Sequence, residues 1–150
     1  MELADHAATR ALGERVARAA LPGDVYLLTG DLGSGKTTLV QGMARGLDAV
    51  DDVSSPTFVI QNQYRTGRLP LFHIDLYRLE RIEAAFLDEL EEDLFDGGGM
   101  SAVEWPELLP EDLTTGAHWI VLRTCPDGGR TAAVHSAAVR VLNAARATPP

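Results

Sequence analysis

The chain has 150 residues, a net charge of −9 and a single cysteine. The negative charge argues against a broad nucleic-acid surface, because non-specific binding to nucleic acid needs many lysines and arginines that neutralise phosphates. Cys125 has no second cysteine with which to form an internal disulfide, and no apolar run is long enough to span a bilayer or to act as a signal peptide. We therefore expect one cytoplasmic domain over residues 1–150, with no membrane contact.

The apolar spacing predicts a helix over residues 5–20, a short buried strand over 25–28 and, after a glycine-rich loop, a helix over 38–47. Residues 58–64 and 69–74 flank a turn, which indicates a hairpin. The later expected elements are an acidic helix over 79–95, a strand over 100–103, a hairpin with strands over 118–122 and 131–134, and a closing helix over 139–145. This order predicts an α/β fold, a three-layer sandwich with helices on both faces of a mixed central β-sheet.

The loop contains the motif G-x-x-x-x-G-K-[ST], which runs from Gly30 to Thr37 between the expected strand and helix. Its glycines allow main-chain N–H groups to approach phosphate oxygens, and the helix that begins near Gly35 directs its N-terminal dipole at the anion. Lys36 would contact the β- and γ-phosphates, and the Thr37 hydroxyl would bind Mg²⁺. The motif predicts a P-loop NTPase.

Lys36 is the only lysine in the chain, because the other twelve of the thirteen basic residues are arginines. A compact ammonium on a thin stem fits a nest of backbone N–H groups, whereas the planar fork of arginine is too broad. The absence of any other lysine also excludes the Asn-Lys-x-Asp element with which Ras-like GTPases recognise guanine. We therefore expect ATP as the nucleotide.

Two acidic residues follow expected strands and are candidates for the second Mg²⁺ anchor that P-loop enzymes need. Asp75 follows the strand that contains His73, and Glu104 follows the strand over 100–103. One of the two would hold the metal, directly or through water, and the other could orient the attacking water. The spacing alone equally fits two solvated acids, and we expect His73 to be a packing residue.

Four blocks of sequence resemble, in order, the bacterial TsaE (formerly YjeE) family of ATPases. The blocks are GDLGSGKTT (30–38), SSPTFVI (54–60), LFHIDLYRL (71–79) and VEWPE (103–107). The resemblance implies a small P-loop ATPase that uses ATP and Mg²⁺ and is required for threonylcarbamoylation of the adenosine 3′ of the tRNA anticodon. Its implied partners are a TsaD-like transferase subunit and a paralogous TsaB-like scaffold, with tRNA reached only indirectly. Slow ATP hydrolysis would reset this complex.

The resemblance also implies roles for individual residues. The implied nucleotide-binding residues of the loop are Gly33, Ser34, Gly35, Lys36, Thr37 and Thr38. Thr37 and Glu104 would be the Mg²⁺ ligands, and the implied catalytic residues are Lys36, Asp75 and Glu104. Outside the loop, Thr57 would lie in a first switch near the γ-phosphate, Trp105 in a second switch, Thr9 near the adenine, and Arg130 at the border of the nucleotide.

Two other classes of function remain open at this point. Many small-molecule P-loop kinases share the strand–loop–helix opening, although no arginine-rich lid stands out among Arg65, Arg68, Arg78 and Arg81. A nucleotide-dependent binding module with negligible turnover is the other alternative.

The account of the lone lysine predicts that Lys36→Arg fails despite keeping the positive charge. We expect its affinity for ATP to fall about tenfold or more, as in Lys36→Ala, because the guanidinium does not fit the nest. Calorimetric titration of both variants with ATP measures this, and wild-type affinity in Lys36→Arg would refute the account.

Overall fold

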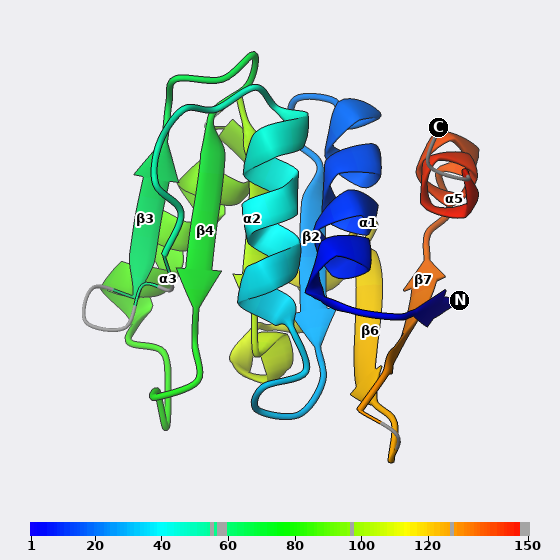
Figure 1. The fold of residues 1–150 in the computed structure, drawn as a ribbon. Helices are drawn as coiled ribbons and strands as arrows, with labels where there is room; N and C mark the ends of the chain where they lie inside the picture. The colour runs from blue at the N-terminus through cyan, green and yellow to red at the C-terminus, as the bar shows by residue number, and fades with distance from the viewer. Residues whose placement is uncertain (55, 57–59, 97, 127, 148–150) are drawn as a thin grey trace.

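We describe the fold from a computed structural model, which describes residues 1–54, 56, 60–96, 98–126 and 128–147. Within these residues, seven strands form one sheet in the order β1-β7-β6-β2-β5-β4-β3 (Figure 1). The strands are β1 (Glu2–Leu3), β2 (Val25–Thr29), β3 (Gln61–Tyr64), β4 (Leu71–Asp75), β5 (Met100–Glu104), β6 (His118–Thr124) and β7 (Arg130–His135). The four central strands are parallel, while β3, β7 and β1 each pair antiparallel with a neighbour. The sheet is therefore mixed, as predicted.

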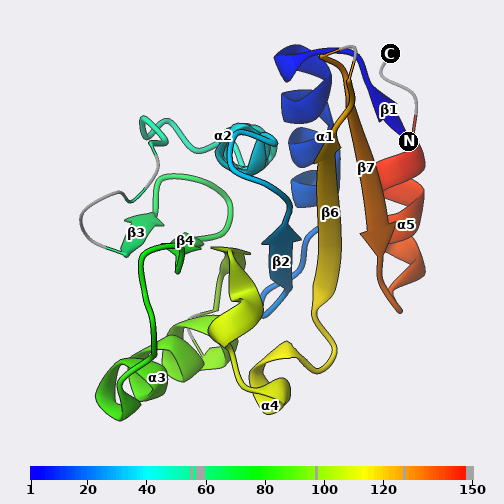
Figure 2. The ribbon, with the colours of Figure 1, turned by 90° about the horizontal axis from the view of Figure 1, so that it is seen from below.

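Helices cover both faces of this sheet, which confirms the predicted three-layer α/β sandwich (Figures 1 and 2). The helices α1 (His6–Arg18) and α2 (Lys36–Gly46) lie on one face, and α5 (Val139–Arg146) packs against α1 near the edge formed by β7 and β1. The opposite face carries α3 (Ala84–Glu91), which continues as the π-helical turn η1 (Glu92–Asp96), and the short helix α4 (Glu111–Thr114). A 3₁₀ turn, η2 (Pro106–Leu108), follows β5. Among the described residues, no helix is long and apolar enough to cross a membrane.

The core has two layers, which are separated by the sheet. The strand β2 is apolar and buried on both sides, so that Tyr26 and Leu28 pack toward α1 and α2 while Leu27 packs toward α3. This alternation explains why a continuous apolar run forms a strand at the centre of the sheet. On the α1 side the helices approach backbone to backbone, because a Cβ at Gly42 would lie 2.0 Å from the carbonyl oxygen of Arg10. That approach places the start of α2 beside the start of α1.

Some boundaries differ from the sequence-based predictions. The acidic helix begins at Ala84 and not near 79, because the chain first turns around the end of β5: Leu76 N donates to Glu104 O, and Leu79 N donates to Leu76 O. The strand expected over 58–64 is described only as Gln61–Tyr64, and residues 57–59 lie outside the described residues. Neither β1 nor α4 was predicted, because two residues and a single helical turn are too short to show a period.

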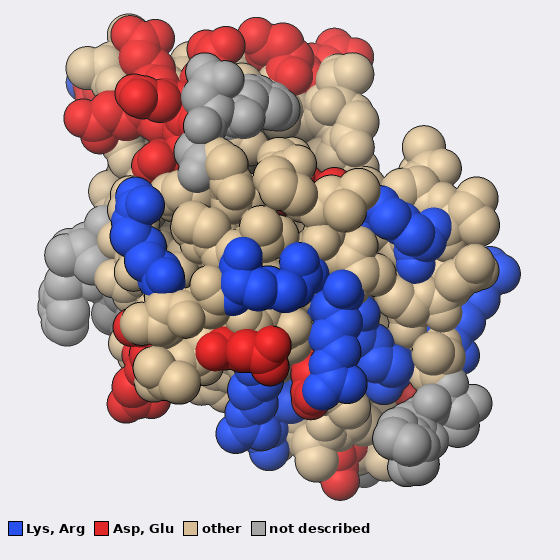
Figure 3. All heavy atoms as spheres, turned by 90° about the horizontal axis from the view of Figure 1, so that it is seen from above, with Lys and Arg blue, Asp and Glu red and all other residues tan. Residues whose placement is uncertain are grey.

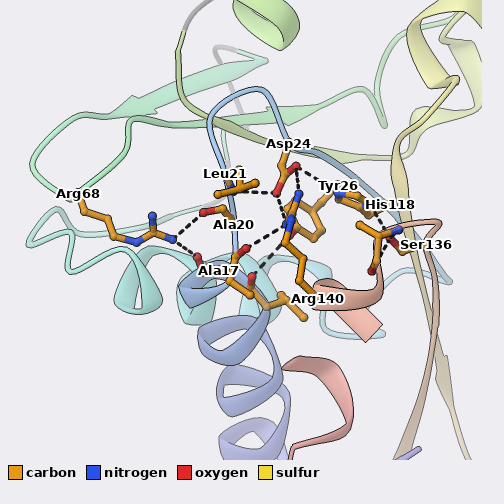
Figure 4. Close-up of polar contacts among 12 residues, drawn as sticks. Ala17, Ala20, Leu21, Asp24, Tyr26, Arg68, His118, Ser136 and Arg140 are labelled. Atoms are coloured by element: carbon orange, nitrogen blue, oxygen red, sulfur yellow. Dashed lines mark hydrogen bonds and ion pairs between the residues drawn. The ribbon is translucent and has the colours of Figure 1, made fainter. Parts of the chain in front are cut away.

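A partly buried ion pair between Asp24 and Arg140 holds together the end of the molecule opposite the glycine-rich loop (Figure 4). Asp24, just before β2, accepts hydrogen bonds from Arg140 at 2.8 and 2.6 Å, from Leu21 N at 2.9 Å, and contacts His118 Nε2 at 3.3 Å. Arg140 also donates to Ala19 O at 2.9 Å. Burial acts to raise the pKa of Asp24, but the hydrogen bonds from His118 and Arg140 outweigh it, so that this pKa lies below its ordinary value. One carboxylate thus ties together the end of α1, the start of β2, β6 and α5.

Arginines gather at this same end of the molecule (Figure 3). Arg68 donates to Ala20 O at 3.0 Å and to Arg18 O at 3.2 Å, so Arg68 and Arg140 together cap the C-terminus of α1. Cations are stabilising there because the helix dipole is negative at its C-terminus. The net charge of −9 is therefore distributed unevenly over the surface.

We expect Asp24→Asn to lower the free energy of unfolding by about 1–2 kcal/mol at pH 7, because it removes the charge that strengthens the hydrogen bonds from the half-buried Arg140 guanidinium. A carboxyl whose pKa is lower in the folded state stabilises the fold above its unfolded-state pKa and loses that contribution as the pH falls. The difference from wild type should therefore shrink below about pH 4. Urea unfolding at pH 7 and pH 3 measures this, with the exposed Asp112→Asn as control; an equal difference at both pH values would contradict the assignment.

Candidate nucleotide site at the carboxyl end of the parallel strands

The glycine-rich loop from Gly30 to Gly35 connects β2 to α2 and forms the floor of the site. Gly30, Gly33 and Gly35 have φ values of 141°, 78° and 104°, which residues other than glycine rarely adopt. A Cβ at Gly30 would also lie 2.2 Å from the carbonyl oxygen of Leu122. Gly35 is the N-cap of α2 and provides no side-chain hydrogen bond, so the first N–H groups of α2 remain suited to an anion.

Lys36, the first residue of α2, folds back over this loop. Its Nζ donates to Gly30 O at 2.6 Å and to Asp31 O at 3.0 Å, and lies 3.9 Å from the centroid of the Trp105 ring. Burial lowers the pKa of Lys36 from its ordinary value, while the charges of Glu104 and other nearby carboxylates oppose this effect. The ammonium thus lies within the loop, ringed by carbonyl oxygens and an aromatic face.

Thr37 and Glu104 connect α2 to the end of β5. The Thr37 hydroxyl donates to Glu104 Oε1 at 2.9 Å, and the Glu104 side chain is buried. On the parallel strand β4, Asp75 is the register partner of Glu104, so the two acidic residues lie side by side at the same sheet edge. Mg²⁺ in proteins is usually held by one or two carboxylates together with phosphate oxygens of the substrate. The hydroxyl of Thr37 and the carboxylate of Glu104 fit that requirement.

Trp105 forms one wall of the site in an unusual backbone conformation. Its φ of 58° is in the left-handed region, immediately before Pro106, and its N–H donates to Leu28 O at 3.2 Å. The indole contacts the Tyr77 ring with centroids 4.8 Å apart. A non-glycine residue in this region is strained and persists only where its surroundings hold it, and here the contacts of Trp105 with Lys36 and Tyr77 supply that support.

These groups surround a pocket of about 250 Å³, lined by His6, Leu32, Gly33, Gly35, Lys36, Thr37, Thr38, Asp75, Tyr77, Glu104 and Trp105. Eight of the residues that the sequence analysis selected therefore lie together around one pocket. Ser34 is adjacent but fully buried, and its hydroxyl has no partner among the described residues. Thr57 lies outside the described residues.

Thr9 and Arg130 lie behind the loop. The Thr9 hydroxyl donates to Asp5 O at 3.1 Å within α1, and its methyl group lies beside Gly35, 3.5 Å from where a Cβ would stand. The Nε of Arg130, from the start of β7, lies at the same distance of 3.5 Å from that position. Their roles at the nucleotide stay predictions.

The sequence analysis missed His6 and Tyr77. The ring of His6 bridges the site, with Nδ1 3.4 Å from Thr38 Oγ1 and Nε2 3.3 Å from Arg130 Nη2. A clue was available, because His6 lies three residues before Thr9 and residues at this spacing share a helix face. Tyr77 lies within the family block LFHIDLYRL (71–79), but no role was assigned to it, and its ring reaches the site through a turn after β4.

The strand, glycine-rich loop and helix, together with an acidic residue at the end of the neighbouring parallel strand, define a P-loop NTPase, a class whose members bind nucleotides. The family model described as "Threonylcarbamoyl adenosine biosynthesis protein TsaE" matches residues 3–132. The chain belongs to the TsaE family, as the resemblance had indicated.

Individual relatives agree with this assignment. A "tRNA threonylcarbamoyladenosine biosynthesis protein TsaE" from Synechocystis is 47% identical over 113 residues, which cover 73% of this chain and 71% of the relative. The Bacillus subtilis protein of the same name is 44% identical over 123 residues, 81% of this chain and 75% of the relative. The crystal structure of Bacillus subtilis YdiB superposes with a TM-score of 0.78 at 34% identity, covering 96% of this chain and 88% of YdiB.

The contact between Lys36 and Trp105 predicts a change in tryptophan fluorescence when nucleotide binds. Lys36 would give up a cation–π contact worth about 0.5–1 kcal/mol and bind phosphate oxygens instead. This change alters the electric field at the indole ring. We expect the emission of Trp105, isolated in a Trp119→Phe background, to change on addition of ADP or ATP. The same background with Lys36→Ala should start from a different emission and respond weakly to nucleotide. An unchanged spectrum of the Trp119→Phe protein that keeps Lys36, at saturating nucleotide, would contradict this prediction.

Proposed function

We propose that this chain is a Mg²⁺-dependent ATPase that acts in the synthesis of threonylcarbamoyladenosine on tRNA, at the adenosine 3′ of the anticodon. The observation that carries the ATPase part is the 2.9 Å contact between the Thr37 hydroxyl and Glu104, which joins the loop helix to the end of β5. The pathway rests on the family, whose relatives carry that pathway in their names.

The proposed mechanism uses the site residues as follows. The backbone N–H groups of Gly33 and Gly35 and the start of α2 bind the phosphates, and the Lys36 ammonium turns from the carbonyl oxygens of the loop toward the β- and γ-phosphates. Thr37 and Glu104 would hold Mg²⁺, which when bound neutralises charge that develops on the phosphate oxygens. Asp75, beside Glu104 on β4, is positioned to orient the attacking water.

We further propose that activity depends on partners, namely a TsaD-like transferase subunit and its TsaB-like scaffold. Hydrolysis by the isolated chain would be slow, and the partner pair would stimulate it. The net charge of −9 supports an indirect route to tRNA, because a broad RNA surface would need more cations. We propose the cytoplasm as the location and a single catalytic domain over residues 1–150.

The test measures phosphate release with and without the purified partner pair. We expect Glu104→Gln to bind ATP within about threefold of wild type but to lose about 10²–10³-fold in turnover, because the lost charge acts mainly where phosphate charge develops. The exposed Glu111→Gln is the matched control and should behave as wild type.

Three results would overturn the proposal. Near-normal hydrolysis by Glu104→Gln would remove its proposed role, and phosphate release no greater than that of Lys36→Ala would leave only a nucleotide-dependent binding module. Rapid phosphorylation of a nucleoside or a sugar would favour a small-molecule kinase.

A further inference from the structure

His73 lies on β4 beside the site, but it does not line the pocket. Its side chain is fully buried on β4, and its Nε2 lies 2.8 Å from Glu104 Oε1. The sequence analysis expected a packing histidine. The structure confirms the burial and adds a hydrogen bond to the carboxylate that the proposed function assigns to the metal.

The direction of this hydrogen bond follows from the chemistry of the two groups. A carboxylate only accepts, so we assign the ring proton of His73 to Nε2. The other ring nitrogen, Nδ1, is buried and has no partner among the described residues. A single proton on Nε2 leaves no buried N–H without an acceptor, which is the arrangement that proteins strongly prefer. The one N–H group of the His73 ring therefore donates to Glu104.

The register of the strands explains why the imidazole can reach the carboxylate. His73 is paired with Ala102 and Asp75 with Glu104 on parallel strands, so His73 and Glu104 are diagonal neighbours on one face of the sheet. The small side chain of Ala102 leaves room across the strand for the ring. On the other side, the Tyr64 ring lies with its centroid 6.3 Å from that of His73.

Two donors from different elements thus meet on one carboxylate oxygen. Thr37 approaches Glu104 Oε1 from α2, and His73 approaches the same atom from β4. Among the groups that the structure describes, no donor is recorded for the second oxygen, Oε2. Because a carboxylate is rigid, holding Oε1 between two donors also sets the direction of Oε2.

We propose that His73 is a positioning residue, which holds the Glu104 carboxylate in the orientation that binds Mg²⁺ together with Thr37. This inference rests on the proposed function. Removing a group that orients a metal ligand typically lowers metal affinity 10–100-fold. His73 would act in the same way, through the ligand and without touching nucleotide.

The experiment measures binding of Mn²⁺, as a spectroscopic substitute for Mg²⁺, to the protein saturated with a non-hydrolysable ATP analogue. We expect His73→Leu to weaken Mn²⁺ binding about 10-fold or more, as measured by electron paramagnetic resonance. Its affinity for ADP without metal should stay within about twofold of wild type. His73→Gln, which keeps an N–H donor at similar reach, should recover most of the metal affinity. His73→Met offers a second apolar variant if His73→Leu does not fold.

Leu71→Ala is the packing control, because Leu71 is buried on the same face of β4 and contributes no polar atom. It should lower the thermal midpoint but leave Mn²⁺ affinity unchanged. Wild-type Mn²⁺ affinity in folded His73→Leu, or an equal loss in Leu71→Ala, would overturn the inference while the proposed function stands. Failure of the wild-type protein to bind Mn²⁺ with the analogue would instead overturn the Mg²⁺ site itself.

Discussion

The parallel pairing of β2, β5 and β4 is the constraint on which the site depends. This register sets Leu28 opposite Glu104, and Glu104 opposite Asp75, at the edge where the glycine-rich loop leaves β2. A slip of one residue in β5 would move Glu104 to the α3 face of the sheet, away from Thr37. The apolar alternation along these strands prevents such a slip, because it would expose one core layer and place polar groups in the other. Packing of the apolar side chains thus holds the polar site residues in place, although these residues are not part of the apolar core.

The two ends of the sheet use charge in opposite ways. At the carboxyl end, Lys36 donates to two carbonyl oxygens near several carboxylates, and the N-cap Gly35 offers no side-chain acceptor to the first N–H groups of α2. At the other end, Asp24 is surrounded by donors and its pKa is held below the ordinary value. The first arrangement suits a ligand that brings its own negative charge. The second is complete in itself and joins four segments of the chain.

Much of the fold follows from local sequence patterns. The strand β2, the loop and α2 were predicted because an apolar run, a glycine motif and a helical period follow one another between Val25 and Gly46. The order of elements also indicated the three layers. The start of α3 was wrong by about five residues, since backbone contacts between the chain after β4 and the end of β5 delay the helix. Such contacts join residues about 28 positions apart, which no local pattern records.

The sequence by itself determined the chemical groups that the site offers: a glycine-rich loop with one lysine, a threonine hydroxyl beside it, and acidic residues at two strand ends. These properties belong to short motifs, whose backbone preferences and side chains are local. Only the tertiary structure decided that Glu104 meets the Thr37 hydroxyl, that His73 donates to the same carboxylate, and that His6 reaches Thr38 and Arg130. These contacts depend on strand order and register, which are set when distant segments bury a common core.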